Sequence, residues 1–230
     1  MLKIENVEVY GWEAAIRGMR NPMNSWARSD SNFSCRECND CYYKDEMHKE
    51  ASLGVIDQWC EHTALRIGEN DIDLMKRLAE GGSTHAKYRR MITVTLDVVA
   101  PLYWWKEYDT YKVGTVANSC STMHKIHAKE FTLDDFSHER MRGGALLTLL
   151  SVVVPQLNED RLSFIETKDR QYWDNMIQLL PSSYNQRRTL LLNYEVLTAI
   201  YHDRRKHKLD EWHTLCDWIE TLPHSEIITR

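Results

Sequence analysis

The chain has 230 residues, of which 43% are hydrophobic and 27% charged. Its 8 Trp and 11 Tyr against 9 Gly and 5 Pro are typical of a packed globular protein and exclude a low-complexity or disordered chain. The formal net charge of -5 disfavours binding to nucleic acid or to an anionic membrane surface. No segment has the roughly 18 consecutive apolar residues of a transmembrane helix, and the N-terminus lacks a signal peptide's apolar run. We therefore expect a cytoplasmic protein with free thiols rather than disulfides.

Three segments in the first half of the chain have clear periodicity. Residues 4–9 alternate apolar and polar side chains, which predicts a short edge strand. Residues 70–82 carry an apolar stripe at helical spacing, with Asn70 as a candidate N-cap, and predict a helix. Residues 92–98 alternate strictly and are rich in β-branched side chains, which predicts a strand with one buried face.

Helical patterns dominate the rest of the chain. Pro101 is suited to the first position of a helix over residues 102–108, whose Trp104 and Trp105 we expect to be buried. Residues 145–154 are so continuously apolar that they predict a buried helix that anchors the core. An Asp-Asp pair in the polar segment 131–142 indicates a helix start, and three further helical patterns span residues 169–180, 184–203 and 209–222.

The order of these elements predicts an α+β fold in which several helices pack on a small mixed sheet. No internal repeat and no linker divide the chain, so residues 1–230 are expected to form a single domain. A polar, cysteine-containing loop insertion at about 29–67 interrupts it.

The cysteines of this insertion form the most conspicuous local pattern. Cys35, Cys38 and Cys41 are separated by two residues each, a spacing with which a turn can aim thiolates at one zinc ion. Cys60 or His48 could supply the fourth ligand, but the second cysteine pair of a zinc ribbon is missing. A cysteine-bearing surface loop without metal is the favoured alternative.

Residues 81–125 hold a second candidate site. A helix stop, a strand and an Ala-Pro step are followed by a dense polar run from Lys106 to Ser121. This run offers cations for a phosphate, a carboxylate and amides for the edge of a base, and aromatic side chains to cover a ring. A helix end with ordinary salt bridges is the alternative, and a free cysteine such as Cys120 is expected to be a buried, inert thiol.

At these residues the sequence resembles the flavin-dependent thymidylate synthases, which methylate dUMP with methylenetetrahydrofolate and reduced FAD. The order of elements and their spacing carry the resemblance, which rests on residues 74–85, the strand 92–98, Ala100-Pro101, Leu179-Leu180-Pro181, Asn193 and Arg204. The signature itself is degenerate, because Thr110-Tyr111-Lys112 stands where the family has Arg-His-Arg. Arginine can form two parallel hydrogen bonds to a phosphate, whereas the ammonium group of lysine cannot bind it in this bidentate way.

The resemblance implies a divergent enzyme with the α+β fold of that family. It would transfer a one-carbon group reductively to dUMP or a related pyrimidine nucleotide, as a homotetramer with FAD between subunits. NADPH and methylenetetrahydrofolate would be its co-substrates. A cofactor-free binding or assembly protein that keeps the scaffold but has lost catalysis is the alternative.

The resemblance also implies a set of site residues. Tyr111, Lys112 and Arg204 would be catalytic. Cofactor contacts would come from His85, Lys87, Tyr111, Lys112, Asn118 and Asn193. Substrate contacts would come from Glu107, Thr115, Ser119, Cys120, Ser121 and Arg204.

Overall fold

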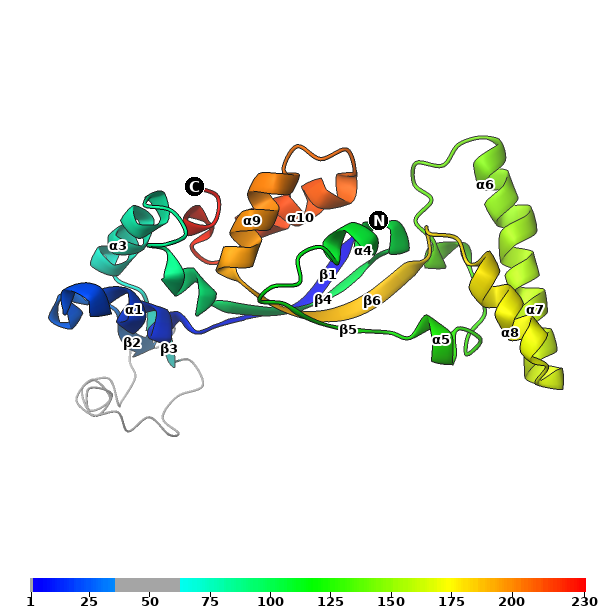
Figure 1. Ribbon diagram of the computed structural model, residues 1–230, viewed down its shortest axis with the longest axis horizontal. Helices are drawn as coiled ribbons and strands as arrows, with labels where there is room; N and C mark the ends of the chain where they lie inside the picture. Colours follow the sequence, from blue (N-terminus) through cyan, green and yellow to red (C-terminus); the bar gives the residue numbers. More distant parts are fainter. Residues whose placement is uncertain (1, 36–62) are drawn as a thin grey trace.

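The computed structural model describes residues 2–35 and 63–230. Its centre is a four-stranded sheet in the order β1-β4-β6-β5 (Figure 1). The strands are β1 (Lys3–Tyr10), β4 (Thr93–Pro101), β5 (Val116–Ser119) and β6 (Asn185–Asn193). A second, two-stranded sheet pairs β2 (Asn32–Cys35) with β3 (Thr63–Arg66). The α+β class expected from the sequence is confirmed.

The four-stranded sheet is antiparallel, not mixed as expected. β1 pairs antiparallel with β4, and β4 and β5 both pair antiparallel with β6. Strands β4 and β5 therefore run in the same direction, but β6 lies between them. Alternation of side chains reports that a segment is a strand and says nothing about the direction of its neighbour.

Strand β6, which lies between β4 and β5, was not predicted as a strand. Residues 185–193 were predicted as the first part of a helix, but they form a strand, and helix α9 (Tyr194–Arg204) begins only after it. Within β6, Gln186, Leu190 and Leu192 are buried on alternate positions. The period is two, but the run of three consecutive leucines obscured it, because a short continuous apolar run does not distinguish a strand from a buried helix segment.

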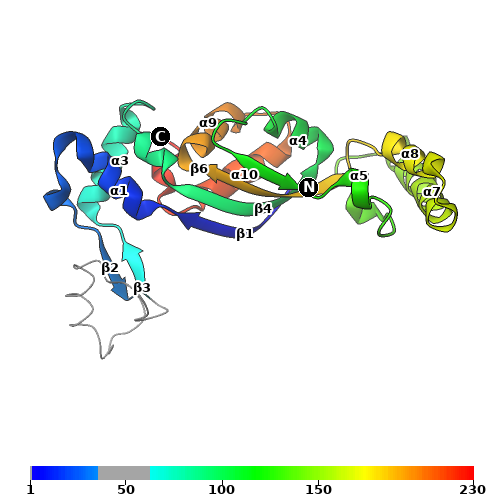
Figure 2. The ribbon, with the colours of Figure 1, turned by 60° about the horizontal axis from the view of Figure 1, so that its bottom comes forward.

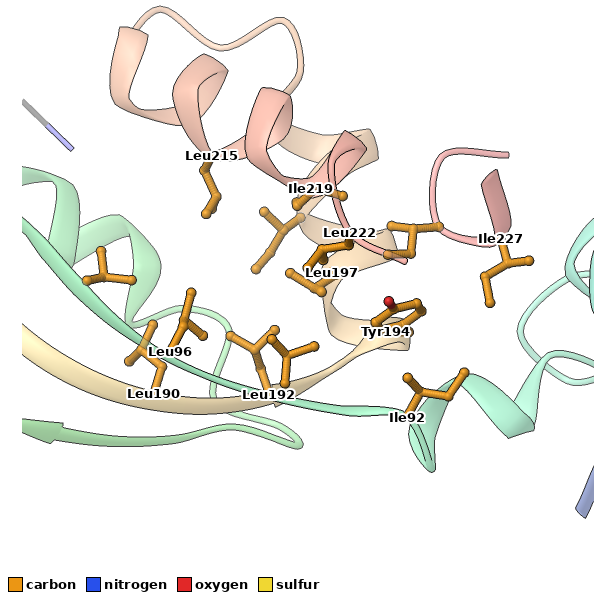
Figure 3. Packing of buried hydrophobic residues seen from close by; sticks show 14 of the residues in the cluster. Ile92, Leu96, Leu190, Leu192, Tyr194, Leu197, Leu215, Ile219, Leu222 and Ile227 are labelled. Carbon is orange, nitrogen blue, oxygen red and sulfur yellow. The ribbon is translucent and has the colours of Figure 1, made fainter. Parts of the chain in front are cut away.

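Helices α4 (Leu102–Tyr108), α9 and α10 (Asp210–Glu220) cover one face of the sheet (Figures 1 and 2). Leu96 and Leu190 point from the sheet toward Leu197 of α9 and Leu215 of α10 (Figure 3). The buried face predicted for residues 92–98 is confirmed. So is the burial of the tryptophan pair, which is at most 1% exposed. Pro101 ends β4 and caps α4 instead of entering it.

Helices α1 (Trp12–Arg20) and α3 (Glu69–Glu80) lie together at one end of the sheet (Figure 1). The helix predicted over residues 70–82 is confirmed, but Asn70 does not cap it. Gly68 is the N-cap residue, and the carboxylate of Asp30 accepts hydrogen bonds from the backbone N–H groups of Asn70 and Asp71. A side chain from another segment thus satisfies the first turn of α3.

A second group of helices extends from the opposite end of the sheet (Figures 1 and 2). It contains α5 (Thr122–Lys125), α6 (Gly144–Thr148), a π-helical turn (Leu149–Val153), α7 (Val154–Thr167) and α8 (Arg170–Leu179). Segment 145–154 is helical as predicted, but the prediction that it is buried is wrong. Leu149 is 4% exposed, whereas Leu147, Leu150 and Val152 are 64%, 42% and 58% exposed. An apolar run therefore lies on the surface of this chain.

Short turns complete the chain. Segment 131–142 contains a 3₁₀ turn (Leu133–Asp135) with a capping box, not a helix. Other 3₁₀ turns span Asn21–Met23, Trp26–Arg28, Lys87–Arg90 and Ser225–Ile227. The proposed zinc ligands Cys38, Cys41, Cys60 and His48 lie outside the described residues. Among the residues that are described, no group of three or more His, Cys, Asp or Glu is placed to hold a metal ion, and no helix is long and apolar enough to cross a membrane.

Candidate functional site

Two segments separated by more than ninety residues meet where α4 and α9 end. After α4 the chain turns back, because the N–H groups of Thr110 and Tyr111 bond to the carbonyls of Glu107 and Tyr108. This turn carries the ring of Tyr111 to the last residue of α9. Arg204 Nε donates to the Tyr111 hydroxyl at 2.9 Å.

Glu107 is the anionic centre of this junction. Its Oε2 accepts a hydrogen bond from Arg204 Nη1 at 2.8 Å and from Trp212 Nε1 at 3.2 Å. His207 Nε2 lies 3.2 Å from the same oxygen. We call Glu107, Tyr111, Arg204, His207 and Trp212 the Arg204 network.

Two aromatic rings, themselves in edge contact, lie beside the cation of the network. The guanidinium carbon of Arg204 lies 4.7 Å from the ring centre of Trp212 and 5.5 Å from that of Tyr111. The Arg204 side chain is 18% exposed, so these rings replace much of its hydration. Burial raises the pKa of Tyr111 above its ordinary value, although the neighbouring Arg204 opposes the shift. Tyr111 is therefore a neutral phenol at physiological pH.

The loop that follows Tyr111 runs along α9 toward the start of that helix. Gly114 has φ +76°, and a Cβ there would lie 3.2 Å from Asn193 Nδ2. Asn193 caps α9 by accepting from Val196 N at 3.0 Å. Lys112 is exposed between these two ends. Thr115, half-buried, donates from its hydroxyl to the Tyr111 carbonyl oxygen, so it fixes the loop.

His85 and Lys87 lie on the turn that precedes β4, and both are exposed. This turn is tied to the start of α9, because the N–H of Tyr194 donates to the Ile92 carbonyl oxygen. Glu195, in the first turn of α9, lies 3.9 Å from a guanidinium nitrogen of the neighbouring Arg90. Neither Arg90 nor Glu195 belongs to the set of site residues that the resemblance implies.

Asn118 and Ser119 lie apart from the Arg204 network, on strand β5. Asn118 pairs with Thr189, whose side chain is exposed on the sheet face away from the helices. Ser119 pairs with Arg188 and points the opposite way, because alternate residues of a strand face opposite sides. The sequence grouped these neighbours in one site, and the pleat separates their side chains.

The residues that follow β5 are exposed. Cys120 was expected to be a buried thiol, but it is exposed at the strand end, where its carbonyl oxygen accepts from Gln186 Nε2 at 2.8 Å. Burial of a free cysteine is a statistical tendency, and the sheet edge overrides it here. Ser121 caps the short helix α5, and its hydroxyl lies 2.7 Å from His124 Nδ1.

His207 and Trp212 are the network members that the sequence reasoning missed. Neither residue was assigned to a site from the sequence. Their contact with Glu107 depends on the turn between α9 and α10, which no local periodicity reports. A His and a Trp that flank such a turn, opposite an acidic helix end, would be the signal to look for.

Comparison with solved structures connects this arrangement to known proteins. A crystal structure of the flavin-dependent thymidylate synthase ThyX from Helicobacter pylori, complexed with FAD and dUMP, matches 99% of this chain and 98% of its own with a TM-score of 0.64. The fold is that of ThyX. Sequence identity is 13%, and a second ThyX structure from the same organism, also with FAD and dUMP, matches both chains over 100% at 12% identity and a TM-score of 0.60. No protein-family model matches the chain, and none of the curated proteins matches its sequence.

Proposed function

We propose that this chain is a divergent thymidylate-synthase-like enzyme that acts on a pyrimidine nucleoside monophosphate. The contact between Tyr111 and Arg204 carries the proposal. It joins the two segments on which the sequence resemblance depends, within a fold whose ThyX neighbours are solved with FAD and dUMP. Reductive one-carbon transfer, with methylenetetrahydrofolate and NADPH as co-substrates, is the reaction we assign to it.

The chain's own residues can bind and orient such a nucleotide. Lys112 is exposed and can pair with the phosphate, since no residue in the described part of the chain bonds to its ammonium group. Arg204 supplies a guanidinium whose position is fixed by the rings of Tyr111 and Trp212. A fixed cation beside the base stabilises negative charge that develops on it during transfer.

The residues around the loop fit FAD in part. Exposed Lys87 and Lys112 suit the negative pyrophosphate of a dinucleotide, and His85 and Asn193 add polar contacts. Asn118 fits poorly because it lies on the other face of the sheet. When bound, FAD would supply the reducing equivalents for the transfer.

A homo-oligomer is part of the proposal, with a tetramer as the expected state. Five exposed large apolar side chains on α6, the π-helical turn and α7 support it, because exposed apolar side chains gathered on one group of helices are typical of an interaction surface. They are Leu147, Leu150, Val152, Leu162 and Ile165. Light scattering after size exclusion should give a multiple of 27.2 kDa. Leu147→Asp should lower that mass, whereas Lys168→Asp on the same helix group should not.

An absorption spectrum tests the function itself. The purified protein should show the bands of oxidised flavin as isolated or after addition of FAD, and dUMP should perturb them. Lys112→Ala should weaken binding of dUMP, whereas Lys125→Ala, which removes an exposed charge elsewhere, should leave it unchanged. A nucleotide at one hundred times its Kd should also stabilise the fold by about 2.7 kcal/mol.

The alternative is a scaffold protein without cofactor. One observation favours it, namely that Glu107 and Tyr111 already pair with the guanidinium of Arg204. A colourless protein whose thermal stability does not respond to FAD, dUMP or dCMP would establish this alternative and refute the enzyme.

A further inference from the structure

The turn before β4 holds a concentration of positive charge. Lys87, Arg89 and Arg90 all lie on the 3₁₀ turn Lys87–Arg90. Within the described residues, Glu195 of α9 is the one carboxylate that forms an ion pair with this turn. Three cations are thus opposed by a single carboxylate, and the turn keeps an excess of positive charge.

Glu195 lies between two guanidinium groups without a hydrogen bond to either. Its Oε2 is 3.9 Å from Arg89 Nη1, and its Oε1 is 3.9 Å from Arg90 Nη2. Hydrogen bonds between a guanidinium and a carboxylate are about 2.7–2.9 Å long. The carboxylate therefore balances part of the charge but satisfies the N–H donors of neither arginine.

Arg89 has donors that the described part of the chain leaves without an acceptor. Its side chain is 4% exposed, yet Nε and Nη2 make no hydrogen bond to any described residue. These two nitrogen atoms form one edge of the guanidinium, and such an edge binds a carboxylate or phosphate through two parallel hydrogen bonds. Arg20 is also 4% exposed, but its Nε donates to Asp71 and its Nη1 to the Ser25 carbonyl oxygen. Because a buried charged donor without an acceptor is costly, the free edge of Arg89 indicates an anionic ligand.

From this geometry we propose that Glu195 is an internal competitor for an anionic ligand. Its carboxylate occupies a site between Arg89 and Arg90 that takes the pyrophosphate group of a dinucleotide when the carboxylate is displaced. The inference rests on the proposed function, which takes this dinucleotide to be FAD.

The chemistry of the site favours a pyrophosphate over the internal carboxylate. Two linked phosphates offer acceptors to both guanidinium groups, whereas the single carboxylate bonds to neither. The site lies at the first turn of α9, where the helix dipole favours negative charge. The Glu195 side chain is 21% exposed, so it can turn toward solvent when a ligand enters.

Glu195→Gln tests the competition, because it keeps the size of the side chain and removes its charge. The experiment measures Kd by calorimetry for inorganic pyrophosphate and for FAD, with thermal stability recorded in parallel. The variant should bind both about tenfold or more tightly than the wild type, since a like charge has left the site. Glu220→Gln, the matched control, neutralises a carboxylate of α10 that pairs with Arg205 and should leave both Kd values unchanged. Equal Kd values for pyrophosphate in the wild type and in Glu195→Gln would overturn the inference.

Arg90→Gln tests the cations of the site. Arg90 is 57% exposed, so this variant should fold even if a change near the buried Arg89 does not. It should weaken binding of pyrophosphate several-fold, and in combination with Glu195→Gln it should remove most of the gain in affinity. A gain that persists in full in the double variant would contradict the placement of the anion between the two arginines.

The two ligands separate this inference from the proposed function. If Glu195→Gln binds pyrophosphate more tightly but neither protein binds FAD or dUMP, the anion site stands and the proposed function is refuted. If both proteins bind FAD and dUMP, and Glu195→Gln gains no affinity for FAD or pyrophosphate, the role of Glu195 is refuted and the proposed function stands.

Discussion

Replacement of Asp71 by Asn should be among the most destabilising conservative changes in this chain. Asp71 is 0% exposed. Its Oδ1 accepts from Arg20 Nε at 2.6 Å. Its Oδ2 accepts from the hydroxyls of Ser29 and Ser31, each at 2.6 Å, and from Ser31 N at 3.2 Å. The carboxylate thus joins α1, α3 and the segment that leads into β2.

The size of the effect follows from these contacts. The amide that replaces the carboxylate would have one acceptor oxygen, so its NH₂ group must face either the guanidinium or the two hydroxyls. Removal of one charge from a buried ion pair costs about 3–5 kcal/mol. Because domains of this kind are stable by about 5–15 kcal/mol, Asp71→Asn should remove a large part of the free energy of unfolding. Urea denaturation at pH 7 measures it, and a loss below about 1 kcal/mol would contradict the reasoning.

Two further measurements separate the ion pair from simple packing. In a double-mutant cycle with Arg20→Met, the combined loss should fall short of the sum by about 0.5–3 kcal/mol. The penalty should also depend on pH. Burial opposes ionisation of Asp71, but hydrogen bonds from Ser29, Ser31 and Arg20 outweigh it and lower its pKa. The carboxylate therefore stabilises the fold above about pH 4 and loses this effect as the pH falls through its folded pKa. A penalty that is constant down to pH 3 would refute this assignment.

Three other predictions concern the site and its scaffold. Arg204→Lys keeps the positive charge but loses the planar guanidinium and its paired N–H donors, so it should weaken nucleotide binding about tenfold in calorimetry. Unchanged affinity would argue against the site. In peptide mapping after brief iodoacetamide treatment, Cys120 should be modified and Cys216 protected, because burial raises the pKa of Cys216 to about 11; equal labelling would contradict both placements. Gly11→Ala should cost more than about 2 kcal/mol by thermal denaturation, since its Cβ would lie 1.9 Å from a backbone carbonyl oxygen. Gly82→Ala is the control, because Gly82 has a similar positive φ but no atom within 4 Å of an added Cβ. An equal loss of stability in both variants would mean that the positive φ alone causes the effect.

Local sequence patterns were sufficient to predict several elements of the fold. The alternation of residues 92–98 predicted a buried strand face, and the aromatic run after Pro101 predicted a helix with Trp104 and Trp105 inside. These predictions succeeded because burial of alternate or helically spaced side chains is decided mostly within one element.

Other features depended on contacts between distant segments. Residues 145–154 have the composition of a core helix, yet only one side of the segment packs in the core. Leu149 is buried with Val153 and Val154 against the same cluster, whereas Leu147, Leu150 and Val152 are exposed. Strand β6 shares its leucine run with helical patterns, and only pairing with β4 on one side and β5 on the other fixes it as a strand.

For the candidate site, the sequence by itself determined the residue types: cations, a carboxylate, hydroxyls and aromatic rings in the segments around Tyr111 and Arg204. Tertiary structure decided how they meet. The turn after α4 brings Tyr111 to Arg204, and the turn after α9 brings His207 and Trp212 to Glu107. The pleat of β5 turns Asn118 to the opposite face of the sheet. Side-chain chemistry is encoded residue by residue, whereas proximity depends on the packing of elements far apart in the chain.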